Sequence, residues 1–222
     1  MCRTTSGSNV MTDWEDRWQR NDTPWDKGYG APPLSEFLDE AGVELHQARR
    51  VLVPGCGSGH DVRELARRGI GATGLDLSET AVAKARAVPR VGNEDYLSGN
   101  LFEADWRIGR EFDAVWEHTC FCAIDPSLRP AYGRAMAEIL PPGGHLVGLY
   151  FLTPWDPGEK EEGPPFATTR EEVVELLSPW FELRKDRMPG RAYPGREGRE
   201  WLAVFGRRNR PNPGVAESDP PA

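Results

Sequence analysis

Residues 49–78, RRVLVPGCGSGHDVRELARRGIGATGLDLS, contain the pattern that decides the fold. A short apolar run ends at a turn with glycines at positions 55, 57 and 59, and a helical pattern follows the turn. The next apolar run closes on an isolated acid, Asp76. Strand–turn–helix units of this kind hold nucleotides at the turn. The stretch therefore predicts an α/β domain with a nucleotide-like ligand.

The alternation of strand and helix continues outward from this unit. Apolar runs predict seven strands, at residues 49–55, 70–78, 95–102, 111–120, 145–152, 180–186 and 200–208. Helical patterns are found at residues 12–20, 34–42, 60–69, 79–88 and 126–144, and from about residue 169 onward. Strands alternating with helices predict a Rossmann-like, doubly wound, mostly parallel sheet that is covered on both faces. The last two strands have no predicted helix between them, so we expect an antiparallel hairpin at one edge.

Two helix starts are indicated by residue type. Ser78 precedes the helix over 79–88 and is expected to cap it. Thr12 is expected to cap the helix over 12–20, with Glu15 three residues later as its reciprocal partner. In that first helix Trp14 and Trp18 are one turn apart, so they share a face.

Composition limits the partners. The chain has 222 residues and a net charge of −8, which argues against a nucleic-acid partner. No apolar run approaches the roughly 20 residues needed to span a membrane, and the N-terminus lacks the apolar stretch of a signal peptide. We expect a cytoplasmic monomer with one domain over residues 12–207 and disordered ends at 1–11 and 208–222. The cysteines, Cys2, Cys56, Cys120 and Cys122, lack the spacing of common zinc sites, so we expect reduced thiols and no metal.

The glycine turn narrows the ligand class. A dinucleotide fingerprint requires a third glycine where this chain has His60, and the Gly-Lys-Ser/Thr of a phosphate-binding loop is absent from the turn. Asp76 suits a ribose diol and would repel a 2′-phosphate. A nucleoside without phosphates fits best, which indicates S-adenosyl-L-methionine. The alternative is a plain strand–helix turn with a surface aspartate.

Several motifs together resemble one enzyme superfamily. VLVPGCGSGHDV, GLDLS and FCAIDP are similar to motifs of class I methyltransferases, and WEDRWQRNDTPWDKG is similar to the N-terminal element of the thiopurine methyltransferase superfamily. The resemblance runs from about Asp13 to Arg207 and is strongest to plant-type halide and thiol (thiocyanate) methyltransferases. It implies the S-adenosyl-L-methionine-dependent transfer of a methyl group to a small-molecule acceptor.

The resemblance also implies which residues border the cofactor. These positions are Trp14, Trp18, Trp25, Gly55, Asp76, Asn100, Leu101 and His118. We add Gly57, which is part of the glycine turn, and Leu77, which directly follows Asp76. Two positions depart from the pattern, because family members often have Asp where this chain has Asn100 and plant-type enzymes have Tyr where it has His118.

The first helix and the loop that carries Trp25 have no place in the sheet. We expect them to fold over its open end as a helical lid, where aromatic rings favour a sulfonium cation. The alternative is that this helix simply packs on the core, with its tryptophans as filler.

The expected chemistry is direct in-line displacement, in which alignment and removal of water from the nucleophile lower the barrier. His118 is the candidate base, since an imidazole titrates near neutrality; the alternative is a polar contact to cofactor or backbone. Tyr150, near the end of the fifth predicted strand, is the other candidate catalytic residue. Two other functions stay open, a cofactor-binding protein without transfer activity and a methyltransferase of macromolecules.

The identity of the methyl acceptor is the part of the function that the sequence specifies least. Its expected wall is aromatic, from Tyr150, Phe151, Trp155 and Phe166, while the acids Glu159, Glu161 and Glu162 are expected to stay outside. A wall of this kind favours small soft nucleophiles, thiols or hydrosulfide at least as much as iodide or thiocyanate. Thiopurine-type aromatic thiols are the alternative acceptors.

Overall fold

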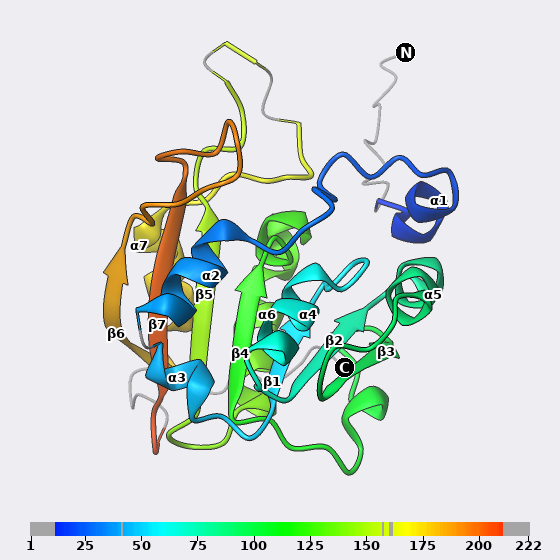
Figure 1. The fold of residues 1–222 in the computed structure, drawn as a ribbon. Helices are drawn as coiled ribbons and strands as arrows, with labels where there is room; N and C mark the ends of the chain where they lie inside the picture. Colours follow the sequence, from blue (N-terminus) through cyan, green and yellow to red (C-terminus); the bar gives the residue numbers. More distant parts are fainter. Residues whose placement is uncertain (1–11, 41, 157, 160–161, 211–222) are drawn as a thin grey trace, which may run out of the picture.

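The computed structural model describes residues 12–40, 42–156, 158–159 and 162–210, and a single twisted sheet lies at its centre (Figure 1). The strand order is β3-β2-β1-β4-β5-β7-β6. The strands are β1 (Val51–Pro54), β2 (Ala72–Asp76), β3 (Glu94–Ser98), β4 (Ala114–His118), β5 (His145–Phe151), β6 (Phe181–Arg187) and β7 (Glu200–Arg207). The first five are parallel, and β7 runs antiparallel to both β5 and β6. The predicted fold class is confirmed, with β7 inserted beside β5 and β6 left at the edge.

Helices cover both faces of this sheet (Figure 1). On one face lie α2 (Pro32–Asp39), α3 (Val43–His46), α4 (His60–Arg67) and α5 (Glu79–Ala87). On the other lie α6 (Arg129–Ile139) and α7 (Arg170–Leu177), with the short 3-10 turns η1 (Asp105–Arg107), η2 (Phe121–Ala123) and η3 (Pro126–Leu128) along the chain before them. Each face has its own hydrophobic cluster. The helix α3, one turn long, was not predicted because a single turn leaves no periodic signal.

Local sequence explains where the elements begin. The residues of β1 and β2 are all buried, as expected for parallel strands covered on both faces. The Ser78 hydroxyl accepts a hydrogen bond from the Ala81 backbone N–H at 3.0 Å, so the predicted cap of α5 is confirmed. Thr169 caps α7 in the same way, accepting from the Glu172 N–H at 3.0 Å.

The predicted capping box of the first helix is wrong. The helix α1 covers Trp14–Gln19, and Asp13 rather than Thr12 caps it, by accepting from the Asp16 N–H at 3.0 Å. Glu15 turns away from the helix start and accepts from the Ser78 hydroxyl at 2.6 Å, and also from Thr80. Asp13, one residue after the predicted Thr12, caps the helix without help from Glu15. The Glu15 carboxylate is therefore free to join α1 to the start of α5 (Figure 1).

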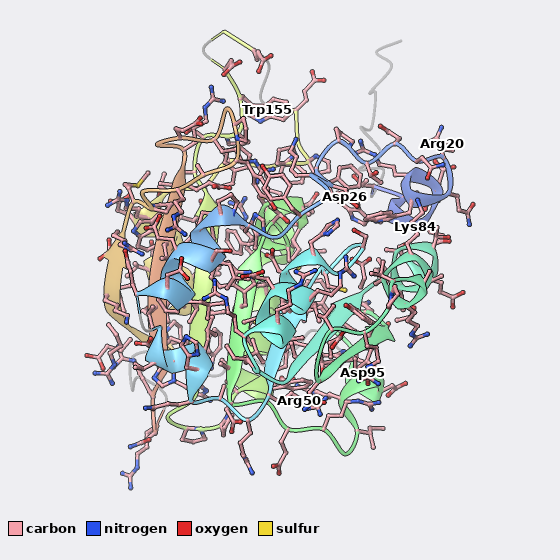
Figure 2. All side chains as sticks on the ribbon, in the orientation of Figure 1. Arg20, Asp26, Arg50, Lys84, Asp95 and Trp155 are labelled. Atoms are coloured by element: carbon pink, nitrogen blue, oxygen red, sulfur yellow. The ribbon has the colours of Figure 1, made fainter. Side chains whose placement is uncertain are left out.

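A second contact joins the same two helices. The Lys84 ammonium on α5 donates to the Asn21 side-chain oxygen at 2.6 Å and to the Trp18 carbonyl at 3.4 Å. Figure 2 shows Lys84 facing the end of α1 that carries Arg20. The N-terminal helix is therefore fastened at both ends to α5.

The predicted disordered ends, 1–11 and 208–222, lie almost wholly outside the described residues. Arg208, inside the second of them, donates its backbone N–H to the Trp180 carbonyl at 2.9 Å, which joins this residue to the domain. Within the described part of the chain, every helix is too short or too polar to cross a membrane.

The Glu15 contact gives a test of how α1 is held. Hydrogen bonds from Ser78 and Thr80 lower the pKa of Glu15 to about 2, below the roughly 4.3 expected of an unfolded chain. A depressed pKa means that the stabilisation is complete above the unfolded value and is lost as the pH falls toward 2. We expect Glu15→Gln to lower the protection of the amides of residues 14–19 against hydrogen exchange at pH 7, to the protection factor that wild type reaches only in acid. Glu79→Gln, an exposed acid on the first turn of α5, is the control. Equal exchange in the two variants would contradict the anchoring role.

Candidate active site

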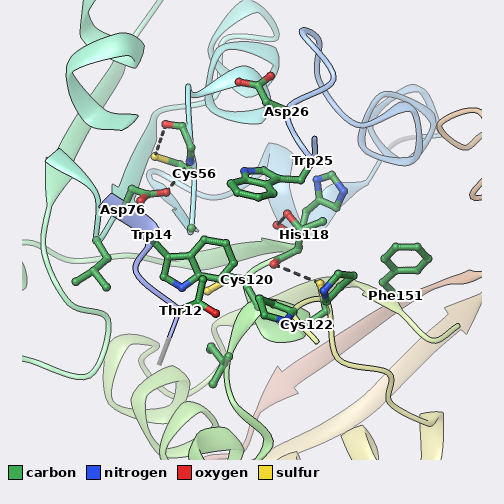
Figure 3. Close-up of a pocket in the computed structure, with 18 of the residues that line it drawn as sticks. Thr12, Trp14, Trp25, Asp26, Cys56, Asp76, His118, Cys120, Cys122 and Phe151 are labelled. Carbon is green, nitrogen blue, oxygen red and sulfur yellow. Dashed lines mark hydrogen bonds between the residues drawn. The ribbon is translucent and has the colours of Figure 1, made fainter. Parts of the chain in front are cut away.

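A cavity of about 650 Å³ lies at the carboxyl ends of the parallel strands (Figure 3). It is beside β1, where the strand order reverses between β2 and β4, the position at which open α/β sheets bind ligands. All ten positions predicted to border the cofactor line this cavity. They are Trp14, Trp18, Trp25, Gly55, Gly57, Asp76, Leu77, Asn100, Leu101 and His118.

The turn after β1 favours glycine at two positions. Gly55 and Gly57 have φ values of 60° and 53°, in the left-handed region that other residues rarely adopt. A Cβ at Gly57 would lie 3.0 Å from Cζ2 of Trp18, and one at Gly55 would lie 3.0 Å from Cβ of Cys120. The backbone of the turn is therefore packed between α1 on one side and the end of β4 on the other.

Asp76 is oriented by the same turn. Its Oδ2 accepts from the Gly57 N–H at 2.8 Å and its Oδ1 from the Ser78 N–H at 2.9 Å. Burial raises the pKa of this carboxyl above its ordinary value, although the two backbone bonds act in the other direction. Each carboxylate oxygen has a second lone pair, so the group can still accept hydrogen bonds from a ligand in the cavity.

The three N-terminal tryptophans form one cluster at the cavity. Trp25 meets Trp14 edge-on at 5.3 Å and Trp18 at 6.2 Å between ring centroids. The Arg17 guanidinium lies 4.3 Å from the Trp25 ring centre. Trp18 is buried against the glycine turn, and Figure 3 shows Trp14 and Trp25 facing the open space. The cluster thus forms a wall of the cavity in addition to packing on the fold.

The rim near β3 is apolar. Asn100 is engaged locally, since its oxygen accepts from the Phe102 N–H at 3.1 Å and its nitrogen donates to Glu103 at 3.2 Å. Leu77 and Phe102 line the cavity although they are 56% and 38% exposed. Phe102 was not predicted, because a single phenylalanine after a strand carries no signal of its own.

A polar cluster joins the Trp25 loop to the glycine turn. Asp26 accepts from the Ser58 hydroxyl at 2.7 Å and pairs with Nε2 of His60 at 2.9 Å. The hydrogen bond with His60 is the main reason that the pKa of Asp26 lies well below its usual range; bonds from Ser58 and Gly28 add to it, and burial opposes it. This ionised carboxylate lines the cavity beside the tryptophans (Figure 3).

His118 ends β4 and belongs to a second polar cluster. Its Nδ1 lies 2.9 Å from Oδ2 of Asp61, and its ring stacks on Tyr193 at 6.0 Å with an interplanar angle of 20°. Both Asp61 and Tyr193 line the cavity, and neither was predicted. Asp61 follows His60 within the quoted motif, so its proximity to the turn was the available signal. Tyr193 is far away in sequence and gave none.

The prediction that Tyr150 is catalytic is corrected by the structure. Phe151 lines the cavity, whereas Tyr150 points to the other face of β5, as alternation along a strand requires. Its ring is 1% exposed and packs edge-on against Phe121 at 5.5 Å, with Trp201 at 5.8 Å. Tyr150 is therefore part of the core on the α6 side.

The acceptor wall differs from the expected one in its charges. Phe151 and Phe166 line the cavity as predicted, while Trp155 is outside the lining. Glu162 also lines it, which contradicts the expectation that this acid stays outside. Glu159 does not line the cavity, and Glu161 lies outside the described residues. The prediction that this wall is aromatic is therefore confirmed for Phe151 and Phe166, whereas the prediction that it is uncharged is wrong.

Arg196 adds a cation to this wall. Its guanidinium lies 4.5 Å from the Phe151 ring centre and 5.5 Å from that of Tyr193, and it pairs with buried Glu200 at 3.0 Å. The loop between β6 and β7, which carries Arg196, folds over the ends of β5 and β4.

Three cysteines also line the cavity: Cys56, Cys120 and Cys122. Burial raises the pKa of each, to about 12 for Cys122, so they remain thiols at neutral pH. In the described part of the chain, no three His, Cys, Asp or Glu side chains gather closely enough to hold a metal ion. The site thus offers hydrogen-bonding groups and aromatic surface to a ligand.

Comparisons with known proteins agree with this geometry. The family described as Thiopurine S-methyltransferase (TPMT) matches residues 10–189. Thiocyanate methyltransferase 1 of Arabidopsis thaliana is 34% identical over 88% of this chain and 85% of its own length. Probable thiol methyltransferase 2 of the same plant is 34% identical over 77% and 74%. The crystal structure of magnesium protoporphyrin IX methyltransferase from Synechocystis PCC 6803 with bound SAM has a TM-score of 0.65 at 16% identity, covering 92% of this chain and 100% of that one.

The glycine turn can be tested by a single methyl group. We expect Gly57→Ala to lower the free energy of unfolding by about 1–2 kcal/mol from its left-handed φ, and to shift the Trp18 indole N–H resonance because the new Cβ meets that ring. Gly69→Ala is the control, since Gly69 has φ 80° and open space around its Cβ position. Urea unfolding and ¹H–¹⁵N spectra measure the two effects. An unchanged Trp18 resonance in Gly57→Ala would show that the turn and α1 are not in contact.

Proposed function

Since this chain belongs to the thiopurine S-methyltransferase family of S-adenosyl-L-methionine-dependent methyltransferases, we propose that its acceptor is a small thiol or another soft nucleophile. The observation that carries this proposal is the wall of Phe151, Phe166 and Arg196 across the cavity from the glycine turn. An aromatic surface favours polarisable sulfur over strongly hydrated oxygen, and one guanidinium attracts a nucleophile with anionic character.

The residues at the glycine turn fit the cofactor. Gly57 leaves its backbone exposed to the cavity, and a side chain there would fill the space beside Trp18. We propose that Asp76 accepts hydrogen bonds from the ribose hydroxyls, since its oxygens are already oriented by Gly57 and Ser78. The exposed apolar side chains of Leu77 and Phe102 would then cover the adenine ring. When bound, S-adenosyl-L-methionine supplies an electrophilic methyl group attached to a sulfonium.

We propose that the tryptophan cluster and the described parts of the loops after β5 and β6 exclude water from this cavity when its ligands are bound. We propose that Trp14 and Trp25 act as the cavity side of a lid, with α1 fastened to α5 by Glu15 and Lys84. A nucleophile stripped of water beside aromatic rings attacks more readily, because its charge is no longer stabilised by solvent. In this proposal His118, Phe151 and Arg196 surround the acceptor.

An aromatic thiol of the thiopurine type is the second candidate. The family description itself favours it, and Tyr193 and Phe151 offer ring surfaces against which a planar acceptor would stack. The relatives at 34% identity carry thiocyanate and thiol in their names, which favours the smaller acceptors. The three free cysteines among the described residues suit a reducing compartment, so we propose a cytoplasmic location, and we propose that the protein is a monomer.

The cofactor pose predicts the cost of losing Asp76. We expect Asp76→Ala to weaken binding of S-adenosylhomocysteine by about 1.5–3 kcal/mol, the value of a hydrogen bond to a charged group. Asp113→Ala is the matched control, since Asp113 also accepts from backbone N–H groups, those of Arg49 and Arg50, at the opposite end of the strands. It should lower stability without changing affinity. Calorimetry that gives Asp76→Ala the wild-type affinity would rule out the ribose contact.

An acceptor panel tests the substrate class. We expect turnover of hydrosulfide and alkyl thiols at least as fast as that of iodide and thiocyanate, with chloride poor because it holds its water more strongly. Thiopurines, and oxygen and nitrogen nucleophiles, complete the panel, and release of S-adenosylhomocysteine is the common readout. Turnover restricted to thiopurines would transfer the assignment to the second candidate. No turnover with any acceptor, despite tight cofactor binding, would indicate a binding protein without transfer activity.

A further inference from the structure

Asp61 occupies an unusual position for a carboxylate at the start of a helix. It is buried, and its Oδ1 accepts from the Ala31 backbone N–H at 2.7 Å. Its Oδ2 accepts from the Trp116 indole N–H at 2.8 Å and lies 2.9 Å from Nδ1 of His118. Three groups from two other parts of the chain therefore fix one carboxylate beside the end of β4.

The charge state of Asp61 determines which nitrogen of His118 carries the proton. Burial acts to raise the pKa of Asp61, but the positive charge that His118 carries when it is protonated and the three hydrogen bonds act against burial and leave the pKa below its ordinary value. An ionised carboxylate only accepts hydrogen bonds. The Nδ1 of His118 must therefore carry a proton, and a neutral imidazole then has its lone pair on Nε2.

The other ring nitrogen, Nε2, has no such partner in the part of the chain that the structure describes. Nε2 of His118 is buried, and within the described residues no group forms a hydrogen bond with it. The ring itself lines the cavity, held flat against Tyr193. A buried polar atom without a partner is costly, so a ligand that donates a proton to Nε2 would be stabilised there.

We propose that Asp61 is a positioning residue that fixes the lone pair on Nε2 of His118, and that Nε2 removes the proton from a neutral thiol acceptor. This inference rests on the proposed function, and it narrows the acceptor to thiols that are still protonated at neutral pH. Halide and thiocyanate carry no proton to remove and do not need it.

The proton step balances within the site. The S–H bond of the thiol breaks, its electron pair stays on sulfur, and the proton forms an N–H bond at Nε2. The sulfur pair then forms the bond to the methyl carbon while the bond from that carbon to the sulfonium of S-adenosyl-L-methionine would break, and S-adenosylhomocysteine would leave with the electron pair of that bond. Asp61 stabilises the imidazolium that results, and the proton leaves to solvent after the transfer.

Other charged groups around His118 bear on its pH dependence. Glu117, adjacent on β4, is buried, and burial raises its pKa to about 7, against the bonds it accepts from the Phe121 N–H and the Tyr132 hydroxyl. On the cavity side, Tyr193 stacks on the ring and Arg196 lies beyond it. The Arg196 guanidinium favours a thiolate beside the imidazolium. Glu117 titrates near neutrality, so it needs its own control.

The test compares two acceptors in the same folded variant. In Asp61→Asn and in His118→Gln we expect kcat/KM for an alkyl thiol at pH 7 to fall about 100-fold, the usual contribution of a general base. With iodide no proton is transferred, so the loss should be smaller than with the thiol, and the ratio of thiol to iodide kcat/KM should fall by about tenfold or more in both variants. As the pH is raised toward the pKa of the thiol itself, more of the acceptor is already a thiolate, so the activity of the variants with the thiol should recover while that of wild type stays level.

Two controls separate positioning from packing. Trp116→Phe removes one donor to Asp61 and leaves the His118 contact, and Glu117→Gln removes the neighbouring acid. Both should keep the wild-type ratio of thiol to iodide turnover. Equal losses with thiol and iodide in Asp61→Asn and His118→Gln would overturn the proposal, as would a wild-type pH profile for the thiol that rises without levelling off.

A spectroscopic measurement tests the role of Asp61 without any measurement of turnover. The ¹⁵N shifts of the His118 ring should show the Nδ1–H tautomer in wild type and the Nε2–H tautomer in Asp61→Asn. The same tautomer in both proteins would overturn the role of Asp61. If wild type turns over neither acceptor, the proposed function fails, and this spectrum alone still tests the inference.

Discussion

The close approach at the glycine turn is the constraint on which the rest of the site depends. Gly55 and Gly57 carry no side chains and adopt left-handed φ values, so the backbone can pass closely between Trp18 and Cys120. A Cβ at either glycine would lie only 3.0 Å from one of these two side chains. That passage presents the Gly57 N–H to Asp76 and brings α1 against the cavity. The orientation of the acid, the position of the tryptophan wall and the shape of the cavity all follow from one tight connection between β1 and α4.

Buried or bridging carboxylates attach the N-terminal segment to the sheet. Glu15 joins α1 to the start of α5, Asp26 joins the Trp25 loop to Ser58, and Asp61 accepts from Ala31 just before α2. Each contact pairs an acid with N–H or hydroxyl donors at the start of a helix or in a turn, where such donors are otherwise unsatisfied. Part of the negative charge of this acidic protein therefore accepts hydrogen bonds that hold its own segments together.

The sequence predicted what local pattern encodes. The alternation of strands and helices, the Ser78 cap and the lining by Trp14, Asp76 and His118 follow from periodicity, turn chemistry and motif resemblance. The site residues that were not predicted, or were predicted wrongly, depend on long-range contacts or on the exact position of a single residue. Tyr150 and Phe151 alternate faces, so a shift of one position reverses which of them meets the cavity. Arg196 and Tyr193 reach the site only because β7 inserts beside β5, and no local signal specifies that insertion.

The insertion of β7 between β5 and β6 has a consequence for how the chain is made. Of the seven strands, β7 emerges last from the ribosome, yet it occupies an interior place in the sheet. Until it arrives, β5 presents an open edge and β6 has no neighbour to pair with, so a nascent chain exposes unpaired strand groups. The loop bearing Arg196 is drawn over the site in the same event. Completion of the sheet and completion of the acceptor wall are therefore one step, and an unfinished chain has neither.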